Sequence, residues 1–292
     1  MTESHLLEAY LAVVGAACGE GDKADANLRR GQFHDVVLLG EVAYRFPRDE
    51  ESRRLLPARM ALLRALRTFE MPVAIPGLLS DAAVAQPLGQ CHAALQRVSG
   101  EPIEPDQLAE TSAQSGVITD LAVLLDRLLE LGTDPAIQEA VPRADPSEWQ
   151  RFADDVSKVL FPLMSRDGRA RAEAELNRVV VVDPTGEALV HGDLGGSNLL
   201  WTGSGSETRL TGILDWDGAH LGNQADDLAS IAVTVGWPLA KELDAKRRGG
   251  QSHVLADAKA IAATFALQQA LPAALSGDKL NLDDGLTGYR KS

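Results

Sequence analysis

The sequence is poor in cysteine and has no long apolar run. Two cysteines among 292 residues, Cys18 and Cys91, are too few for a disulfide scaffold or a thiolate metal cluster. The apolar stretch from Tyr10 to Cys18 is well short of the roughly 18–20 residues that a membrane span needs. No basic segment precedes an apolar stretch at the N-terminus, so we expect no secretory signal and no membrane association. These absences favour a globular, cytoplasmic protein.

Basic residues are also scarce, and the acidic residues are unevenly distributed. The chain has 28 Lys and Arg against 42 Asp and Glu, which gives a net charge of −14. Residues 1–100 carry 11 basic and 12 acidic side chains, whereas residues 101–292 carry 17 and 30. An acidic surface repels nucleic acid, because phosphate binding needs clustered Lys and Arg. It attracts cationic small molecules, although acidic surfaces also serve solubility alone. No feature of the sequence indicates a protein partner.

Apolar spacing and turn residues predict an α+β protein with two lobes. We expect a small β-rich N-terminal lobe at residues 1–98 and a larger, mostly helical lobe at residues 99–292, with a short hairpin inside the second lobe. The expected helices are at 3–18, 49–66, 106–131, 147–162, 168–180, 224–236 and 254–274, and the expected strands at 36–39, 42–46, 93–98, 188–190, 198–201 and 209–214. The apolar face of the longest helix is predicted to carry Leu121, Leu124, Leu125, Leu128 and Leu129. Ligands favour the cleft between two such lobes.

The most specific segments are Leu189 to Trp201, with the sequence LVHGDLGGSNLLW, and Gly212 to Asp217, with the sequence GILDWD. Each polar cluster alone is common in turns and at strand ends. Together, on neighbouring strands, they favour phosphoryl transfer. Asp193 would orient the acceptor hydroxyl and take its proton, and Asn198 and Asp215 would supply the oxygen ligands that Mg²⁺ prefers.

These motifs resemble those of the aminoglycoside phosphotransferase family, the antibiotic kinases related in fold to protein kinases. The resemblance rests on His191-x-Asp193-x4-Asn198, on the Asp215 loop, and on the segment from Gly222 to Ala229. It extends upstream to the segments 31–37 and 42–47, and covers about residues 25 to 275. It implies a bilobal fold with a β-hairpin carrying the catalytic loop, Mg²⁺, and ATP or GTP as phosphoryl donor.

The resemblance also implies residue roles. Arg45 would reach the phosphates, Gly31 and Gln32 would cover them, and the backbone of Gln96 and Val98 at the hinge would contact the base. Two further residues, His191 and Asp227, would brace the catalytic loop without touching substrate.

One family feature is missing from this chain. Members of the family usually pair the phosphate-binding cation with a glutamate in the middle of the next helix, but no acidic residue occurs from Ser52 to Phe69 and Arg59 falls near the expected site. We expect that Glu50 or Glu51 replaces it, or that the pairing is absent.

Five segments resemble the phosphotransferases that act on viomycin and capreomycin, which are cationic cyclic peptide antibiotics. These segments are Gly31–His34, Glu148–Gln150, Leu160–Ser165, Thr264–Leu271 and Asp284–Arg290, and the last four lie outside the catalytic core. The likeness implies transfer of the γ-phosphoryl group to a serine hydroxyl of the peptide.

The candidates for ammonium contacts are Glu148, Asp217, Asp283 and Asp284, with Asp217 also a possible metal ligand. Trp149 or Trp216 is a candidate for stacking on a planar cationic group.

Three rival functions also fit parts of the sequence. The core motif suits a kinase for an aminoglycoside or for a metabolite such as choline or homoserine. A metal-dependent hydrolase would use His191, Asp193 and Asp215 as metal ligands. Arg45 would then have no role in the reaction. An inactive kinase-like binding protein is favoured only by the missing helix glutamate.

Overall fold

The computed structural model describes residues 2–15, 25–31, 33–103, 111–248 and 253–290. Cys18 and Gln32 lie outside these ranges. The first part of the chain forms a five-stranded antiparallel sheet in the order β1-β2-β3-β5-β4. Its strands are β1 (Asn27–Arg30), β2 (His34–Leu39), β3 (Val42–Pro47), β4 (Leu78–Ser80) and β5 (Ala93–Gln96). The predicted β2–β3 hairpin is confirmed, and its two-residue turn places Gly40 at a φ of 55°.

Helices flank this sheet. Helix α1 (Glu3–Val14) packs on the outer face, where Tyr10 stacks on Phe46 with ring centroids 4.1 Å apart. Helix α2 (Glu50–Leu66) begins at Asp49, whose side chain accepts a hydrogen bond from the backbone N–H of Ser52. Because side chains alternate along a strand, Arg45 points away from the face that carries Phe46 and reaches Asp215 and Asp217 of the helical part.

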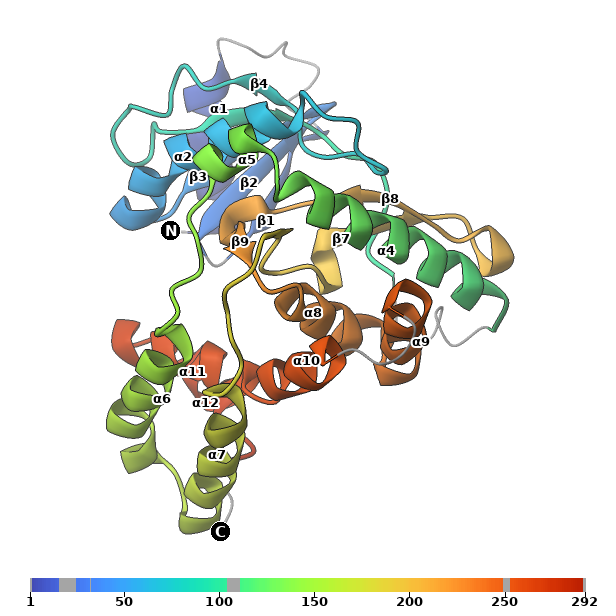
Figure 1. Cartoon of the computed structure of the whole chain (residues 1–292). Coiled ribbons are helices and arrows are strands. Elements are labelled where there is room, and N and C mark those ends of the chain that lie inside the picture. The colour runs from blue at the N-terminus through green and yellow to red at the C-terminus, as the bar shows by residue number, and fades with distance from the viewer. Residues whose placement is uncertain (1, 16–24, 32, 104–110, 249–252, 291–292) are drawn as a thin grey trace.

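The rest of the chain is mostly helical and is arranged around α4 (Thr111–Leu131), the long helix across the middle of Figure 1. The remaining helices are α5 (Pro135–Ala140), α6 (Glu148–Val159), α7 (Arg166–Val179), α8 (Ala225–Val235), α9 (Trp237–Arg248), α10 (Val254–Ala262), α11 (Phe265–Ser276) and α12 (Lys279–Gly285). Four strands form two small antiparallel pairs: β6 (Ala188–Val190) with β9 (His220–Gly222), and β7 (Leu199–Thr202) with β8 (Arg209–Ile213).

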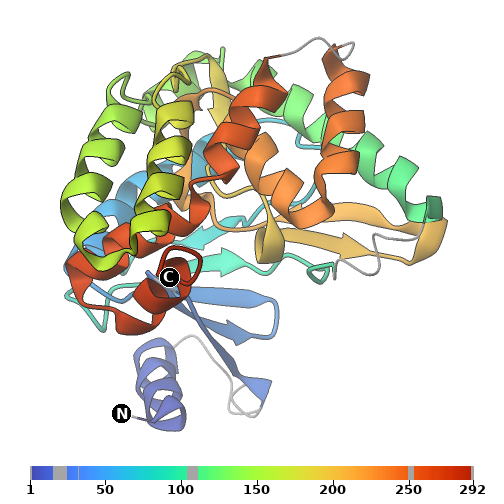
Figure 2. The same cartoon turned by 90° about the horizontal axis from the view of Figure 1, so that it is seen from below.

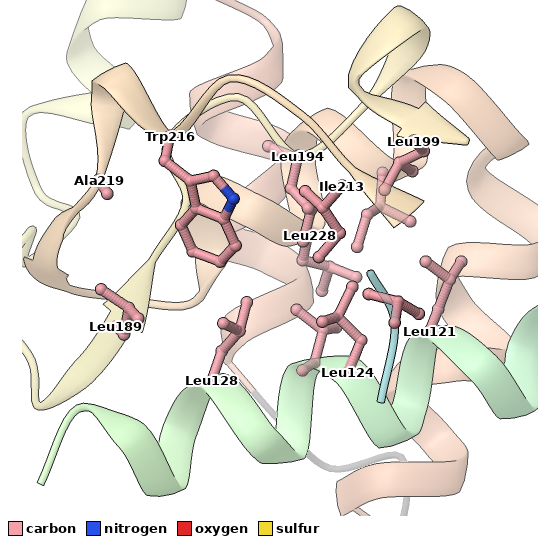
Figure 3. Packing of buried hydrophobic residues seen from close by; sticks show 14 of the residues in the cluster. Leu121, Leu124, Leu128, Leu189, Leu194, Leu199, Ile213, Trp216, Ala219 and Leu228 are labelled. Carbon is pink, nitrogen blue, oxygen red and sulfur yellow. The ribbon is translucent and has the colours of Figure 1, made fainter. Parts of the chain in front are cut away.

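The core beneath these two strand pairs is built on α4. Leu121, Leu124 and Leu128 rise from the helix in Figure 3, with Leu128 beneath Trp216 and Leu121 beneath Leu199. Leu125 is also buried, as predicted, but Leu129 is 42% exposed, so the prediction that it belongs to the buried face is wrong. The apolar stripe of α4 is therefore narrower than the leucine count suggested.

The predicted single helix at 254–274 is two helices. Thr264 is fully buried between α10 and α11, and its hydroxyl donates to the carbonyl of Ile261 at 2.7 Å. Helices α6, α7, α11 and α12 gather at one end of the molecule, in the lower left of Figure 1, and share a separate core that includes the fully buried Tyr289. Figure 2 shows the same helices from below.

The sheet and the helical part are joined by backbone pairing as well as by packing. Ala74 exchanges hydrogen bonds with Thr211 and Ile213 of β8, and the backbone of Glu101 pairs with Trp201 of β7. One buried apolar cluster runs through α2, β5 and the helices below. The lobe boundary at residue 98 stays a prediction. No helix in the described ranges combines the length and apolar character that a bilayer crossing requires.

Candidate active site

The loop between β6 and β7 holds two of the predicted site residues in direct contact. The side-chain Nδ2 of Asn198 donates to the carboxylate of Asp193 at 2.7 Å and to the Asp193 carbonyl at 3.0 Å. The Gly195 N–H also donates to that carbonyl, and the Asn198 N–H donates to the Gly195 carbonyl. These short-range bonds fix the Asp193 carboxylate at the surface of the loop.

Buried groups brace this loop from below. The carboxylate of Asp227, at the start of α8, accepts the backbone N–H groups of His191 and Gly192, each at 3.0 Å. The His191 ring is fully buried, with Nδ1 3.3 Å from the Asp193 N–H and Nε2 2.9 Å from the Leu214 carbonyl. Since Nδ1 accepts, Nε2 carries the proton and donates. The predicted bracing role of His191 and Asp227 stays a prediction, and these hydrogen bonds are the contacts that such a role would use.

The two glycines of the loop allow it to approach α8 closely. A Cβ on Gly195 would lie 2.6 Å from the Ser230 carbonyl and 2.7 Å from the Thr234 hydroxyl. Gly196 has a φ of 51°, and its N–H donates to the Thr234 hydroxyl at 2.7 Å. Thr234 was not predicted as a site residue, because nothing in the local sequence links it to the loop.

The second motif follows β8 and lies beside the first. The Leu214 N–H donates to the Asn198 carbonyl at 2.9 Å, which places Asp215 next to Asn198. Asp215 has a φ of 56°, the one positive φ of a non-glycine residue in the described ranges. The next side chain, Trp216, is buried in the core and anchors the loop (Figure 3).

Arg45 connects this loop to the sheet. Its Nη2 lies 2.9 Å from Asp215 Oδ1 and 2.5 Å from Asp217 Oδ2, and it also contacts His34 Nδ1 at 3.0 Å. Arg59 of α2 reaches the same Asp217 oxygen at 2.8 Å.

The expected substitutes for the missing helix acid do not contact Arg45 in this network. Glu50 pairs with Arg53 at 2.6 Å, and Glu51 is exposed. The counter-ions of Arg45 come from the Asp215 loop instead.

The local environment separates the pKa values of these acids. Burial raises the pKa of Asp215, but Arg45 lowers it more, so the net shift is downward. Burial and the neighbouring Asp215 raise the pKa of Asp217 to about 6, against the pull of two arginines. Burial and the same arginines lower the pKa of His34 to about 3, so its ring is neutral. Loss of hydration and the nearby Asp215 also raise the pKa of Asp193.

The predicted nucleotide contacts come from the sheet and from the segment that follows β5. Gly31 closes a tight turn, because its N–H donates to the His34 carbonyl and an added Cβ would lie 2.8 Å from that oxygen. The Gln96 N–H already donates to the Gly77 carbonyl, so a base contact from Gln96 would use its carbonyl. Val98 is buried. Gln32 lies outside the described residues.

The predicted substrate acids are dispersed. Glu148, at the start of α6, lies close enough to Asp226 and His220 for their charges to affect its pKa, which burial and Asp226 raise. Asp217 is only 12% exposed and faces the arginines, which does not favour an acceptor contact.

The other two acids pair within the C-terminal segment: Asp283 with Arg290, and Asp284 with Gln269. Trp149 and Trp216 are buried, so neither offers an open face for stacking.

The oxygen donors fit Mg²⁺. Asn198 uses its Nδ2 on Asp193, so its Oδ1 is the atom available to a cation, and Asp215 supplies a carboxylate beside it. Among the residues that the structure describes, no three His, Cys, Asp or Glu side chains form a metal-binding group. Mg²⁺ is commonly held by one or two protein oxygens together with substrate phosphates, which this pair allows.

The chain belongs to the phosphotransferase enzyme family, whose model matches residues 27–263. A viomycin phosphotransferase from Streptomyces vinaceus is 37% identical over 263 residues, covering 90% of this chain and 92% of the relative. The chain is therefore a phosphotransferase.

Solved structures share its fold. An APH(2″) aminoglycoside phosphotransferase in complex with GDP and kanamycin has a TM-score of 0.79 at 19% identity, covering 95% of this chain and 96% of that one. Macrolide 2′-phosphotransferase type I has a TM-score of 0.70 at 18% identity, covering 100% and 99%. The predicted α+β, bilobal, protein-kinase-like fold is confirmed.

Proposed function

We propose that this enzyme transfers the γ-phosphoryl group of ATP or GTP to a serine hydroxyl of a cationic cyclic peptide antibiotic of the viomycin and capreomycin type. The arrangement of Asp193, Asn198 and Asp215 on one pair of neighbouring loops supports the reaction. The acceptor rests on the 37% identity to viomycin phosphotransferase, which extends over nearly the whole chain.

In this proposal Asp193 is the catalytic base. Its carboxylate is exposed, is held by Asn198, and has a raised pKa, so it can accept a hydrogen bond from the acceptor hydroxyl and take its proton. Arg45 binds the phosphates as a planar, permanently charged donor. Asn198 and Asp215 would hold Mg²⁺, which offsets phosphate charge during transfer.

The electrostatics of the larger lobe suit a cationic acceptor. Residues 101–292 carry 30 acidic against 17 basic side chains, and Glu148 and Asp226 lie next to the end of the Asp215 loop. A positively charged drug is drawn to such a surface. Kanamycin, bound by a structural neighbour, is also cationic, so an aminoglycoside is the second acceptor to test.

The contacts of the site disfavour both a hydrolase and an inactive binding protein. A hydrolase with His191 as metal ligand would need a free ring nitrogen, but both nitrogens are hydrogen-bonded inside the core. An inactive binding protein would not need Asp193 and Asn198 fixed together at the surface of the loop.

The decisive experiment is mass spectrometry of the acceptor after incubation with the enzyme, Mg²⁺ and ATP or GTP. Capreomycin, viomycin, kanamycin and choline are tested in parallel. We expect a gain of one phosphoryl group on the cyclic peptides alone. A gain on kanamycin or choline alone would keep the reaction and refute the acceptor.

Variants test the residue roles. Asp193→Asn should lower the transfer rate by about 10²- to 10⁴-fold while nucleotide binding persists, because general-base catalysis is worth that much. Asp215→Ala should weaken Mg²⁺-supported nucleotide binding as well. Glu187→Gln removes an exposed carboxylate just before β6 and is the matched control. Near-normal turnover of Asp193→Asn would show that another group is the base.

A further inference from the structure

The ion-pair network around Arg45 contains a second cation from another element. The Asp217 Oδ2 atom lies between Arg45 Nη2 of β3, at 2.5 Å, and Arg59 Nη1 of α2, at 2.8 Å. The side chains of Arg45, Asp217 and Arg59 are only 10%, 12% and 15% exposed. His34 lies against both arginines and is neutral, so it adds no charge to the network.

The two carboxylates that contact Arg45 differ in their surroundings. Asp215 is 48% exposed and has the oxygen chemistry that a bound cation requires. If Asp215 turns to such a cation, Asp217 is the one close anionic partner left to Arg45 among the described residues. A buried guanidinium without a counter-ion is costly, so the position of Asp217 decides where Arg45 points.

Arg59 is the second cation that contacts Asp217 Oδ2. It reaches the carboxylate from α2, whose residues also contact the turn Trp216–Gly218 that follows Asp215. Asp217 Oδ1 and Arg45 Nε are buried and have no hydrogen-bond partner among the residues that the structure describes, so the shared Oδ2 carries this contact. Loss of Arg59 would leave one cation for Asp217 and remove its tie to α2.

We propose that Arg59 is a positioning residue for nucleotide binding: it fixes Asp217, and Asp217 in turn holds Arg45 toward the phosphates. This inference rests on the phosphate-binding role of Arg45 in the proposed function. In this inference Asp217 replaces the missing helix glutamate as the partner of Arg45, and the helix supplies Arg59, which holds Asp217.

The test is the dissociation constant of MgATP and of MgGTP, each measured by calorimetric titration without any acceptor. Arg59→Gln and Asp217→Asn should each weaken binding about tenfold, in the range of measured couplings between contacting charges. The double variant should be no weaker than either single variant, because both break the same link. Arg59→Lys, which keeps the charge, should stay within about threefold of wild type. Arg54→Gln removes an exposed charge from the same helix and is the control.

Thermal unfolding of every variant separates a folding defect from a binding defect. The inference is overturned if folded Arg59→Gln binds nucleotide normally, or if its effect adds fully to that of Asp217→Asn, which would indicate direct phosphate contact by Arg59. Arg45→Gln separates the phosphate-binding role of Arg45 from the positioning role of Arg59. If it binds nucleotide normally, the phosphate role of Arg45 in the proposed function fails; if it binds weakly and Arg59→Gln binds normally, only the positioning role of Arg59 fails.

Discussion

We expect the hydrogen bond between Thr234 and the loop between β6 and β7 to affect the rate of phosphoryl transfer. The Thr234 hydroxyl accepts the Gly196 N–H at 2.7 Å and donates to the Ser230 carbonyl within its own helix at 3.0 Å. Thr234→Val keeps the shape of the side chain and removes the acceptor. A typical hydrogen bond contributes about 1 kcal/mol net. If that whole cost falls on the active arrangement of the loop, the transfer rate falls about fivefold.

The assay is single-turnover phosphoryl transfer at saturating nucleotide and acceptor, with the unfolding midpoint measured in parallel. Thr234→Ser restores the hydroxyl and should restore the rate. Thr133→Val is the matched control, since the Thr133 hydroxyl also bonds a helix carbonyl, that of Glu130 at 2.7 Å, but contacts no part of the site. A wild-type rate for Thr234→Val, or a rate for Thr234→Ser as low as that of the valine variant, would refute the reasoning.

Three further predictions concern stability. Tyr289→Phe removes the 2.6 Å bond from the Tyr289 hydroxyl to buried Glu175, so urea unfolding should show a loss of about 2 kcal/mol, and an unchanged midpoint would contradict this. Gly168→Ala would push a Cβ into the Tyr289 carbonyl and should cost about 1–3 kcal/mol in the same assay. Burial lowers the pKa of His220, but hydrogen bonds to Asp226 and to a backbone carbonyl raise it to about 8, above its usual 6.5. These hydrogen bonds add about 2 kcal/mol to the free energy of unfolding below pH 6.5, and this contribution is lost as the pH rises through 8. The free energy of unfolding of the wild type should therefore fall between pH 6.5 and 9, and that of His220→Asn should not show this fall.

Elements with local signals were predicted well. The β2–β3 hairpin has two apolar runs around a two-residue turn, and α2 has an aspartate cap followed by acidic first-turn residues. The two apolar strands expected at 198–201 and 209–214 form the β7–β8 pair, which brings the two polar motifs side by side.

Elements that depend on distant partners were missed. The short strands β1, β4 and β9 have weak patterns and exist because a neighbouring strand supplies their hydrogen bonds. Helix α9 follows directly after Gly236, which has a φ of 90° and turns the chain between two helices. The close approach of the catalytic loop to α8 is equally invisible in the sequence, because Gly195 and Thr234 are far apart along the chain.

The missing helix acid shows the same limit most clearly. The sequence shows that α2 has no carboxylate after its first turn, and the nearest acids along the chain are Glu50 and Glu51. Those residues lie where the positive end of the helix dipole favours them. Arg45 is buried, however, so its charge must be matched in space and not along the chain. Asp217, 172 residues away, provides that match, and Arg59 of the helix contacts the same carboxylate oxygen. Arg59, near the position where the family usually has a glutamate, is thus explained only when all the charges of the buried network are considered together.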